Sequence, residues 1–174
     1  SMYGLKVETK TPLARLVQTG AYPLPTDELT VEMYYQALKT LKEAGFKRYE
    51  FSNFAKPGYE SKHNLNYWDC GEYLALGLGA HGEFNQTRYE NTKDFKAYLI
   101  NPTCSNYYNY NKKERLENKL IFGLRKAEGI NLNTLSDEFD QDITHLFEQT
   151  IAKYTKTGFL TLKNHQLKLT DKAI

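Results

Sequence analysis

The segment from Tyr49 to Phe84 restricts the structure of this chain more than any other part of the sequence. It combines a strand-like start, a Pro-Gly turn, a cluster of aromatic residues, two histidines and a run of glycines. Glycine allows backbone conformations and close approaches that other residues do not. Tyrosine and tryptophan pack their rings while a polar end finds a hydrogen-bond partner. We therefore interpret this segment as one that forms a functional site.

Composition places the chain among ordinary globular proteins, with 174 residues, 40% hydrophobic and 25% charged. Its 14 tyrosines favour half-wet interfaces or ligand-binding walls. A net charge of +2 gives no basis for electrostatic binding to nucleic acid or to a membrane. Cys70 and Cys104 have no partner motif, and the chain contains neither a membrane-length apolar run nor a signal peptide. We expect a reducing, cytoplasmic environment.

The N-terminal third has the pattern strand, helix, strand. Tyr3, Leu5 and Val7 alternate with other residues over 3–9, which predicts a strand. A short helix can start at Thr11, and a longer one runs from Thr26 to Gly45 with an apolar stripe on one face. A second strand pattern covers 46–51. This order predicts a βαβ unit with a parallel pair of strands.

After the central segment, the sequence predicts a short strand over 87–91, a helix over 94–99 capped by Thr92, and a linker over 101–111. From Lys112 onward, apolar stripes predict one helix ending at Gly129, a second over 132–139 and a third from Ile143 to Gly158. A hairpin of 159–162 and 166–169 follows. Three helices and a two-stranded ribbon are typical of a winged-helix domain. The third helix lacks a basic run, so we expect a packing module rather than a reader of nucleic acid.

The run His63-Asn-Leu-Asn-Tyr-Trp68 groups a histidine with two amides and two aromatic residues. In a helix, His63 and Tyr67 would share one face. The imidazole could then ligate iron or bind a carboxylate, while the rings stack on a flat ligand. The alternative is structural, with Tyr67 and Trp68 in the core and His63 capping a helix. Spacing alone favours the structural alternative.

The run Leu76-Gly-Leu-Gly-Ala-His-Gly82 predicts a strand leading into a glycine-rich turn. Its glycines at 77, 79 and 82 match the G-x-G-x-x-G pattern, but a dinucleotide site needs a helix after the pattern. Glu83-Phe-Asn-Gln-Thr87 has no helical periodicity, so we reject that interpretation. The glycines still allow close approach to a ligand or to another backbone. His81 would face such a site or be a buried histidine bonded to the main chain.

Several of these motifs together resemble one known family. They are Tyr3-Gly-Leu-Lys-Val-Glu-Thr-Lys-Thr-Pro12, Tyr49-Glu-Phe-Ser-Asn-Phe-Ala-Lys-Pro-Gly58, His63-Asn-Leu-Asn-Tyr-Trp68 and Tyr73-Leu-Ala-Leu-Gly-Leu-Gly-Ala-His-Gly82. The chain is similar to the C-terminal half of the oxygen-independent coproporphyrinogen III oxidase group of radical S-adenosylmethionine proteins. The His-Asn-x-x-Tyr-Trp and Gly-Ala-His-Gly runs look more like the HemW-type haem chaperones than like the HemN oxidases. The resemblance covers nearly the whole chain.

The resemblance implies a larger parent protein with a partial (β/α) barrel. In the family, a Cys-x-x-x-Cys-x-x-Cys triplet holds a [4Fe–4S] cluster that binds S-adenosylmethionine. This chain has no such triplet, so we expect it to be catalytically inactive alone and to hold no metal by itself. The implied fold class is an α+β fragment. Residues 1–104 would be the end of the barrel domain with its closing segment, and 105–174 a truncated winged-helix-like domain of HemN type.

The resemblance also implies two sets of site residues. One set would approach S-adenosylmethionine, and consists of Gly4, Gly79, Ala80, His81, Gly82 and Glu83. The other would lie beside haem or porphyrin, and consists of His63, Asn64, Tyr67 and Trp68. The implied function is haem binding and delivery to haem-accepting proteins. The alternatives are a genuine coproporphyrinogen III oxidase and, third, a winged-helix binding module.

Overall fold

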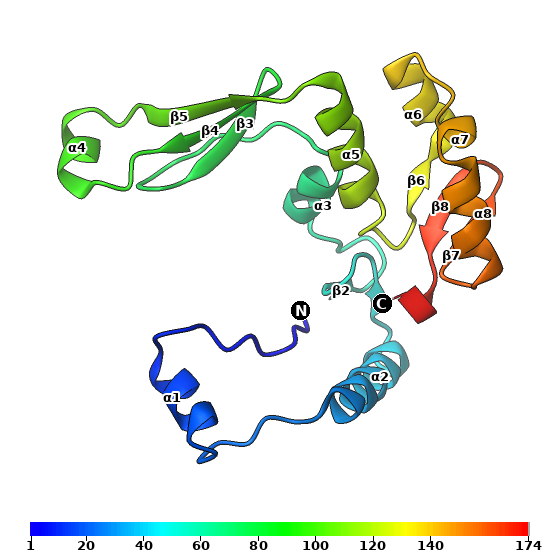
Figure 1. Cartoon of the computed structure of the whole chain (residues 1–174), viewed down its shortest axis with the longest axis horizontal. Coiled ribbons are helices and arrows are strands. Elements are labelled where there is room, and N and C mark those ends of the chain that lie inside the picture. Colours follow the sequence, from blue (N-terminus) through cyan, green and yellow to red (C-terminus); the bar gives the residue numbers. More distant parts are fainter. Residues whose placement is uncertain (174) are drawn as a thin grey trace. The chain divides into compact units, whose positions relative to one another are not determined.

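The computed structural model describes residues 1–173, with only the backbone at positions 104 and 105. The prediction of a free Cys104 thiol therefore lies outside the described residues. The chain divides into two compact units, Ser1–Glu60 and Ser61–Ile174. Both contain helices and antiparallel strands, in keeping with the predicted α+β fold class (Figure 1).

The first unit contains two helices and a small hairpin. Thr11 caps α1 (Pro12–Gln18), and Thr26 caps α2 (Asp27–Glu43), each by accepting a backbone N–H with its side chain. Strands β1 (Lys47–Arg48) and β2 (Phe54–Ala55) pair antiparallel. Between them Glu50 is only 1% exposed, and its carboxylate accepts the N–H of Ser52 at 3.0 Å. Helices α1 and α2 confirm the two helices predicted in this part of the sequence.

The predicted βαβ unit is wrong. Residues 1–8 are all described and form neither helix nor strand. The strand pattern over 46–51 yields only β1, whose partner is the antiparallel β2. Alternation of side chains shows which face a strand would bury, but a strand also needs a neighbour with free backbone groups. The predicted stripe on α2 is likewise only partly covered: Tyr34, Leu38 and Leu41 are half-buried, Val31 is exposed, and no residue of α2 is fully buried.

The second unit starts with α3 (Lys62–Trp68) and a three-stranded antiparallel sheet in the order β3-β4-β5. The strands are β3 (His81–Phe84), β4 (Thr87–Asn91) and β5 (Cys104–Asn109), with α4 (Phe95–Ile100) between the last two. Asn85 and Gln86, both with positive φ, form the tight turn between β3 and β4. The strand at 87–91 is confirmed, and the predicted α4 is capped by Asp94 rather than Thr92.

Two predictions in this region are wrong. Residues 101–111 were expected to be a linker, but they contain β5, which pairs with β4 over most of its length. Asparagine and serine suggested a loop, whereas the tyrosines of this segment favour a strand once a neighbouring edge is available. Residues 76–82 were expected to be a strand followed by a turn. The order is reversed, since the glycine turn at 77–80 precedes β3.

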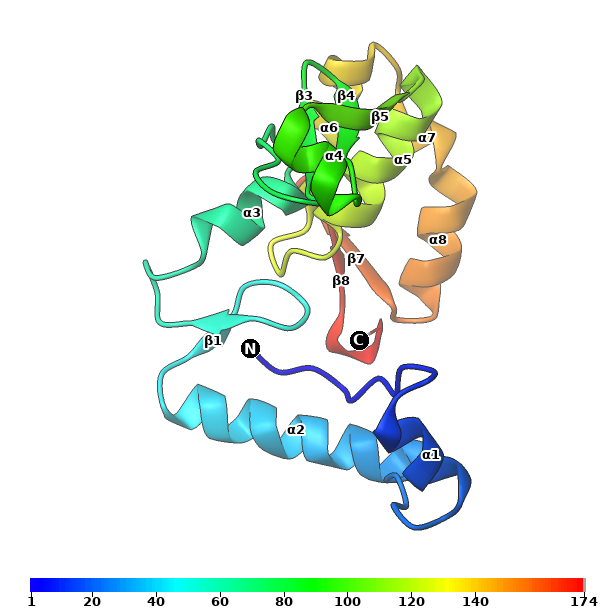
Figure 2. The same cartoon turned by 90° about the vertical axis from the view of Figure 1, so that its left-hand side faces the viewer.

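The C-terminal part packs helices against a second sheet (Figure 2). The helices are α5 (Lys112–Gly123), α6 (Leu132–Phe139), α7 (Ile143–Leu146) and α8 (Glu148–Lys156). The strands are β6 (Ile130–Asn131), β7 (Leu160–Lys163) and β8 (Gln166–Leu169), in the order β6-β8-β7, with a 3-10 turn over Asp171–Ala173. Their apolar side chains form one core, which consists of Leu116, Leu132, Leu135, Phe139, Ile143, Ile151, Leu160 and Leu167.

Most of the C-terminal predictions are confirmed, with two differences. The first helix ends at Gly123 rather than at Gly129, and the third is broken at Phe147, where φ is −110°. The predicted hairpin is present as β7 and β8. Its turn residues Asn164 and His165 both have positive φ, as a two-residue hairpin turn requires. The domain boundary at residue 104 stays a prediction. Among the described residues, no helix is long and apolar enough to cross a membrane.

The C-terminal core should dominate the stability of the second unit. Leu132 is fully buried (0% exposed), whereas Leu146 is 47% exposed. We expect Leu132→Ala to lower the free energy of unfolding by about 2–5 kcal/mol, because it removes buried methyl groups and leaves a cavity. The matched control Leu146→Ala should lower it by less than half as much. Urea unfolding followed by circular dichroism measures both, and equal effects would contradict the assigned core.

Candidate functional site

Helix α3 carries the His-Asn-x-x-Tyr-Trp run. Ser61 caps it by accepting the N–H of Asn64 at 3.3 Å. The predicted shared face is confirmed, because the rings of His63 and Tyr67 meet edge to face with centroids 4.7 Å apart. Tyr67 in turn meets Tyr73 at 4.5 Å. His63 is exposed, so its imidazole is accessible at the outer end of this row of rings.

Trp68 packs against side chains in and just after α5. Its ring lies 6.2 Å from that of Phe122 and 4.4 Å from the guanidinium carbon of Arg125. The next residue, Asp69, forms an ion pair with Lys126 at 2.5 Å, and Lys126 also reaches Glu128 at 3.1 Å. Burial alone would lower the pKa of Lys126, but the hydrogen bonds with these two carboxylates raise it. The lysine therefore stays charged, and α3 is held against α5.

The glycine-rich segment is shaped by contacts within the chain. Asn91 is buried, and its amide donates to the carbonyl oxygens of Ala75 and Gly77 at 3.3 and 2.9 Å. The hydroxyl of Tyr89 accepts the N–H of Ala75 at 2.9 Å. A Cβ atom on Gly82 would lie 2.3 Å from the Tyr89 ring. Gly82 thus leaves room for an aromatic ring of the neighbouring strand.

The residues expected near S-adenosylmethionine differ from one another in their surroundings. Gly79 has φ of 64°, and its N–H donates to the carbonyl of Thr92; the N–H of Ala80 donates to Gly77, while its carbonyl accepts the N–H of Asn91. His81 is exposed and lies 3.7 Å from the Glu90 carboxylate. Glu83 of this set lines a pocket. Gly4 lies in the first unit, and its role stays a prediction.

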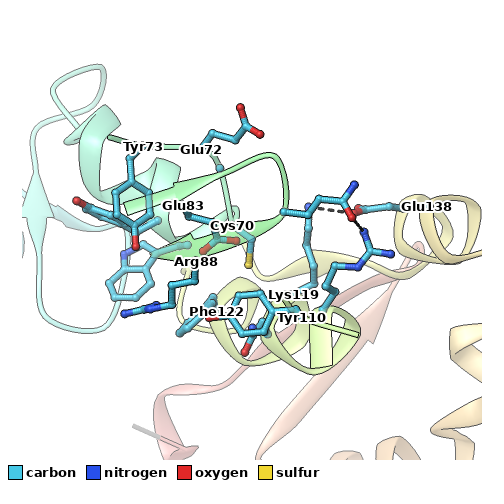
Figure 3. A pocket seen from close by; sticks show the side chains of 15 residues that line it. Cys70, Glu72, Tyr73, Glu83, Arg88, Tyr110, Lys119, Phe122 and Glu138 are labelled. Carbon is cyan, nitrogen blue, oxygen red and sulfur yellow. Dashed lines mark hydrogen bonds and ion pairs between the residues drawn. The ribbon is translucent and has the colours of Figure 1, made fainter. Parts of the chain in front are cut away.

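A pocket with a cavity volume of about 390 Å³ lies between α3, the β3-β4-β5 sheet and α5 (Figure 3). Tyr67 and Trp68 from the predicted haem side and Glu83 from the other set all line it. His63 and Asn64 do not line it. The aromatic walls consist of Tyr67, Trp68, Tyr73, Tyr110 and Phe122, and the basic residues are Arg88, Arg115 and Lys119.

Two of the three basic residues in this pocket have a carboxylate as a neighbour. Lys119 forms an ion pair with Glu138 at 3.2 Å. Glu83 and Arg88 are cross-strand neighbours; burial raises the pKa of Glu83, and the attraction of Arg88 opposes it. Burial would lower the pKa of Arg88, but the hydrogen bond with Tyr110 and the attraction of Glu83 and the neighbouring tyrosines together raise it. Arg115 differs, since its described hydrogen bond is to the neutral amide of Gln86.

Cys70 follows α3 and lines the same pocket with its thiol directed toward the centre (Figure 3). Burial raises the pKa of the thiol to about 11; Lys119 opposes the shift, and Glu83 adds to it. The thiol is therefore protonated at neutral pH and behaves as a small apolar wall. Among the described residues, no three His, Cys, Asp or Glu side chains gather in a group that could hold a metal ion.

Sequence reasoning missed most of this pocket. Arg115, Lys119 and Phe122 come at helical spacing on the face of α5 opposite the apolar stripe, a pattern that is usually a solvated face. Tyr110 fell inside the expected linker. The sequence did contain one signal, the charged Arg88 beside Tyr89 in a predicted strand. Alternation of side chains would have placed Arg88 on the same face of the sheet as Glu83.

The C-terminal part of the chain matches a known domain family, and the fold resembles that of a solved structure. Residues 110–174 match the family described as the HemN C-terminal domain. The structure is similar to that of coproporphyrinogen III oxidase (HemN) from Escherichia coli, a radical SAM enzyme, with a TM-score of 0.68 and 13% identity over 84% of this chain and 38% of that one. At this identity the likeness shows the fold alone.

Two relatives match the sequence more closely than the solved structure does. The chain is 34% identical to the heme chaperone HemW of Bacillus subtilis over 92% of its own length and 44% of that protein. It is 30% identical to the heme chaperone HemW of Lactococcus lactis over 99% of its length and 46% of that protein. The predicted resemblance is confirmed, and the chain corresponds to the C-terminal portion of a HemW/HemN-like protein. It spans less than half of the length of these relatives.

The close approach at Gly82 can be tested by mutation. We expect Gly82→Ala to destabilise the second unit by about 1–3 kcal/mol, because the new methyl group overlaps the Tyr89 ring. In the double variant with Tyr89→Ala the cost of the Gly82 change should nearly vanish, giving strong non-additivity. Thermal unfolding of the four proteins measures the coupling. Additive effects would mean that the glycine serves something other than this ring.

The reactivity of Cys70 tests the burial of its thiol. In a Cys104→Ser background, Cys70 should react with iodoacetamide at pH 8 about a hundredfold more slowly than an unperturbed thiol, because a pKa near 11 leaves that much less thiolate. The rate should keep rising up to about pH 11. The same protein in concentrated urea supplies the reference, and equal rates with and without urea would contradict the buried environment.

Proposed function

We propose that this chain contributes the haem-handling part of a HemW-type protein, and that haem binds at α3. The observation that carries the proposal is the exposed His63 imidazole at the end of a row of aromatic rings, Tyr67 and Tyr73. A neutral imidazole is a common haem-iron ligand, and flat aromatic walls suit a flat ring system. The relatives in Bacillus subtilis and Lactococcus lactis are named heme chaperones.

The packing of α3 supports this role. Trp68 and Asp69 hold the helix against α5 through Phe122, Arg125 and Lys126. His63, at the other end of the helix, is left to meet a ligand from outside. Asn64 completes the proposed haem side with Tyr67 and Trp68. Delivery to a haem-accepting protein would need such an exposed ligand, since a fully enclosed haem could not be handed over.

The S-adenosylmethionine side belongs to the larger protein. Radical chemistry would be supplied by a cluster held by three cysteines, and no Cys-x-x-x-Cys-x-x-Cys occurs in this sequence. The residues present therefore do not fit a cluster, and we derive no step through it. Gly4, Gly79, Ala80, His81, Gly82 and Glu83 stay the proposed contacts of S-adenosylmethionine. The internal hydrogen bonds of 79–80 and the ring beside Gly82 account for these glycines without a ligand.

The domain organisation is also part of the proposal. Residues 1–104 would close a partial (β/α) barrel, and 105–174 would form a winged-helix-like domain that acts in packing. Val31, on the apolar stripe of α2, is exposed and supports this view of the first part, because such a stripe is normally covered. We propose a cytoplasmic location and no nucleic-acid partner.

The second candidate is a genuine coproporphyrinogen III oxidase, which the structural likeness to HemN favours. Full-length protein, incubated anaerobically with S-adenosylmethionine, a reductant and coproporphyrinogen III, decides between the two. Formation of protoporphyrinogen would support the oxidase. Absence of product, with haem binding intact, would support the chaperone.

A haem titration tests the proposed haem side. We expect His63→Ala to weaken haem binding by about tenfold or more and to change the Soret band, because an iron ligand is lost. His145→Ala is the matched control, since this exposed histidine lies on α7, away from α3, and it should bind haem as the parent chain does. Identical spectra and affinities for the parent chain and His63→Ala would remove His63 from the site.

A further inference from the structure

Two buried donors in the pocket beside α3 have no acceptor. The Nε atom of Arg115 and the Nε1 atom of Trp68 are both shielded from solvent, and neither finds a hydrogen-bond partner among the described residues. Both side chains line the pocket. A buried N–H without an acceptor costs about 1–3 kcal/mol. Such a pair of donors favours a ligand that brings an acceptor of its own.

The charge balance points to a carboxylate. Lys119 has Glu138, and Arg88 has Glu83 as its cross-strand neighbour. The carboxylate of Glu72 points away from the pocket (Figure 3) and accepts the N–H of Asn85 at 2.8 Å. Arg115 is left with the neutral Gln86. The pocket therefore holds one cation beyond its carboxylates, and a guanidinium binds a carboxylate through two parallel hydrogen bonds.

The walls define the rest of the ligand. The cavity is lined by Trp68 of α3, Tyr73 of the following loop, Tyr110 just after β5, and Phe122 of α5. Aromatic walls of this kind contact a flat conjugated ring. The cavity of about 390 Å³ is at the small end of ligand sites. It suits a small aromatic acid or one edge of a larger ring system.

We infer that this pocket binds the carboxylate-bearing edge of a flat aromatic molecule, with Arg115 as the carboxylate anchor and Trp68 and Phe122 as ring contacts. The inference deepens the proposed haem-handling function and rests on it for one source of the ligand, because a tetrapyrrole is a flat ring with carboxylate side chains. The other source is a free aromatic acid. In the first case the pocket would hold the carboxylate edge of a tetrapyrrole near the row of rings that ends at His63.

The test uses the whole chain and its single tryptophan, Trp68, whose fluorescence reports on ligands. The probes are protoporphyrin IX, its dimethyl ester and the small acid 4-nitrocinnamate. Protoporphyrin IX contains no iron, so its binding does not depend on ligation by His63. We expect the ester to bind about tenfold to a hundredfold more weakly than the acid, because it lacks the charge-assisted hydrogen bonds.

Variants of α5 complete the experiment. Arg115→Met should reduce binding of the acid to the level of the ester and leave the ester unchanged, while Arg115→Lys should fall between. Lys113→Met is the matched control, because it removes a positive charge from the same helix at an exposed ion pair with Glu117. Thermal unfolding checks each variant, and if Arg115→Met does not fold, Arg115→Lys carries the comparison.

The outcomes separate this inference from the proposed function. Equal binding of acid and ester, or equal effects of Arg115→Met and Lys113→Met, would overturn the Arg115 site. Haem binding that depends on His63 would then still support the proposed function. Arg115-dependent binding of 4-nitrocinnamate without binding of protoporphyrin IX would support the site and assign it to a smaller acid. No binding of any probe would overturn the inference.

Discussion

The contact between α3 and α5 is the interaction on which the candidate site depends. Trp68 packs against Phe122 and Arg125, and Asp69 is paired with a Lys126 that is largely buried. A cation on an aromatic face contributes about 0.5–2 kcal/mol to stability. Removing one partner of a shielded ion pair strongly destabilises the protein. These contacts fix the position of α3, which is too short to be stable alone. They also form one wall of the pocket.

The two ends of α3 have different roles. The Trp68 end is fixed by the C-terminal helices, while the His63 end stays exposed. The aromatic row runs from His63 through Tyr67 to Tyr73, which lines the pocket. A ligand on the outside of α3 would therefore be connected with the pocket through rings that meet edge to face. The separation of a fixed end from an accessible end suits binding followed by release.

Sequence patterns predicted the C-terminal half well. The stripes at Leu132 and Ile143 and the hairpin turn at Asn164–His165 act through neighbours close in the chain, so periodicity and turn chemistry suffice. The failures share one cause. A strand over 3–9, a parallel partner for 46–51 and a linker over 101–111 all depend on which distant edge offers free backbone groups. β5 shows this most clearly, since its asparagines and tyrosines form a strand only because β4 lies beside it.

The site follows the same rule. The shared face of His63 and Tyr67 is fixed by helical spacing and could be predicted. The contacts of Trp68 could not be predicted, because Phe122 in α5 and Arg125 just after it come more than fifty residues later in the chain. The charge of Arg115 gave no signal either. An arginine on a helix is normally solvated, and it becomes a candidate anchor only where packing buries its Nε without an acceptor. Buried polar atoms without partners are therefore the feature that distinguishes this pocket from an ordinary gap between helices, and they arise from the tertiary fold rather than from any local pattern.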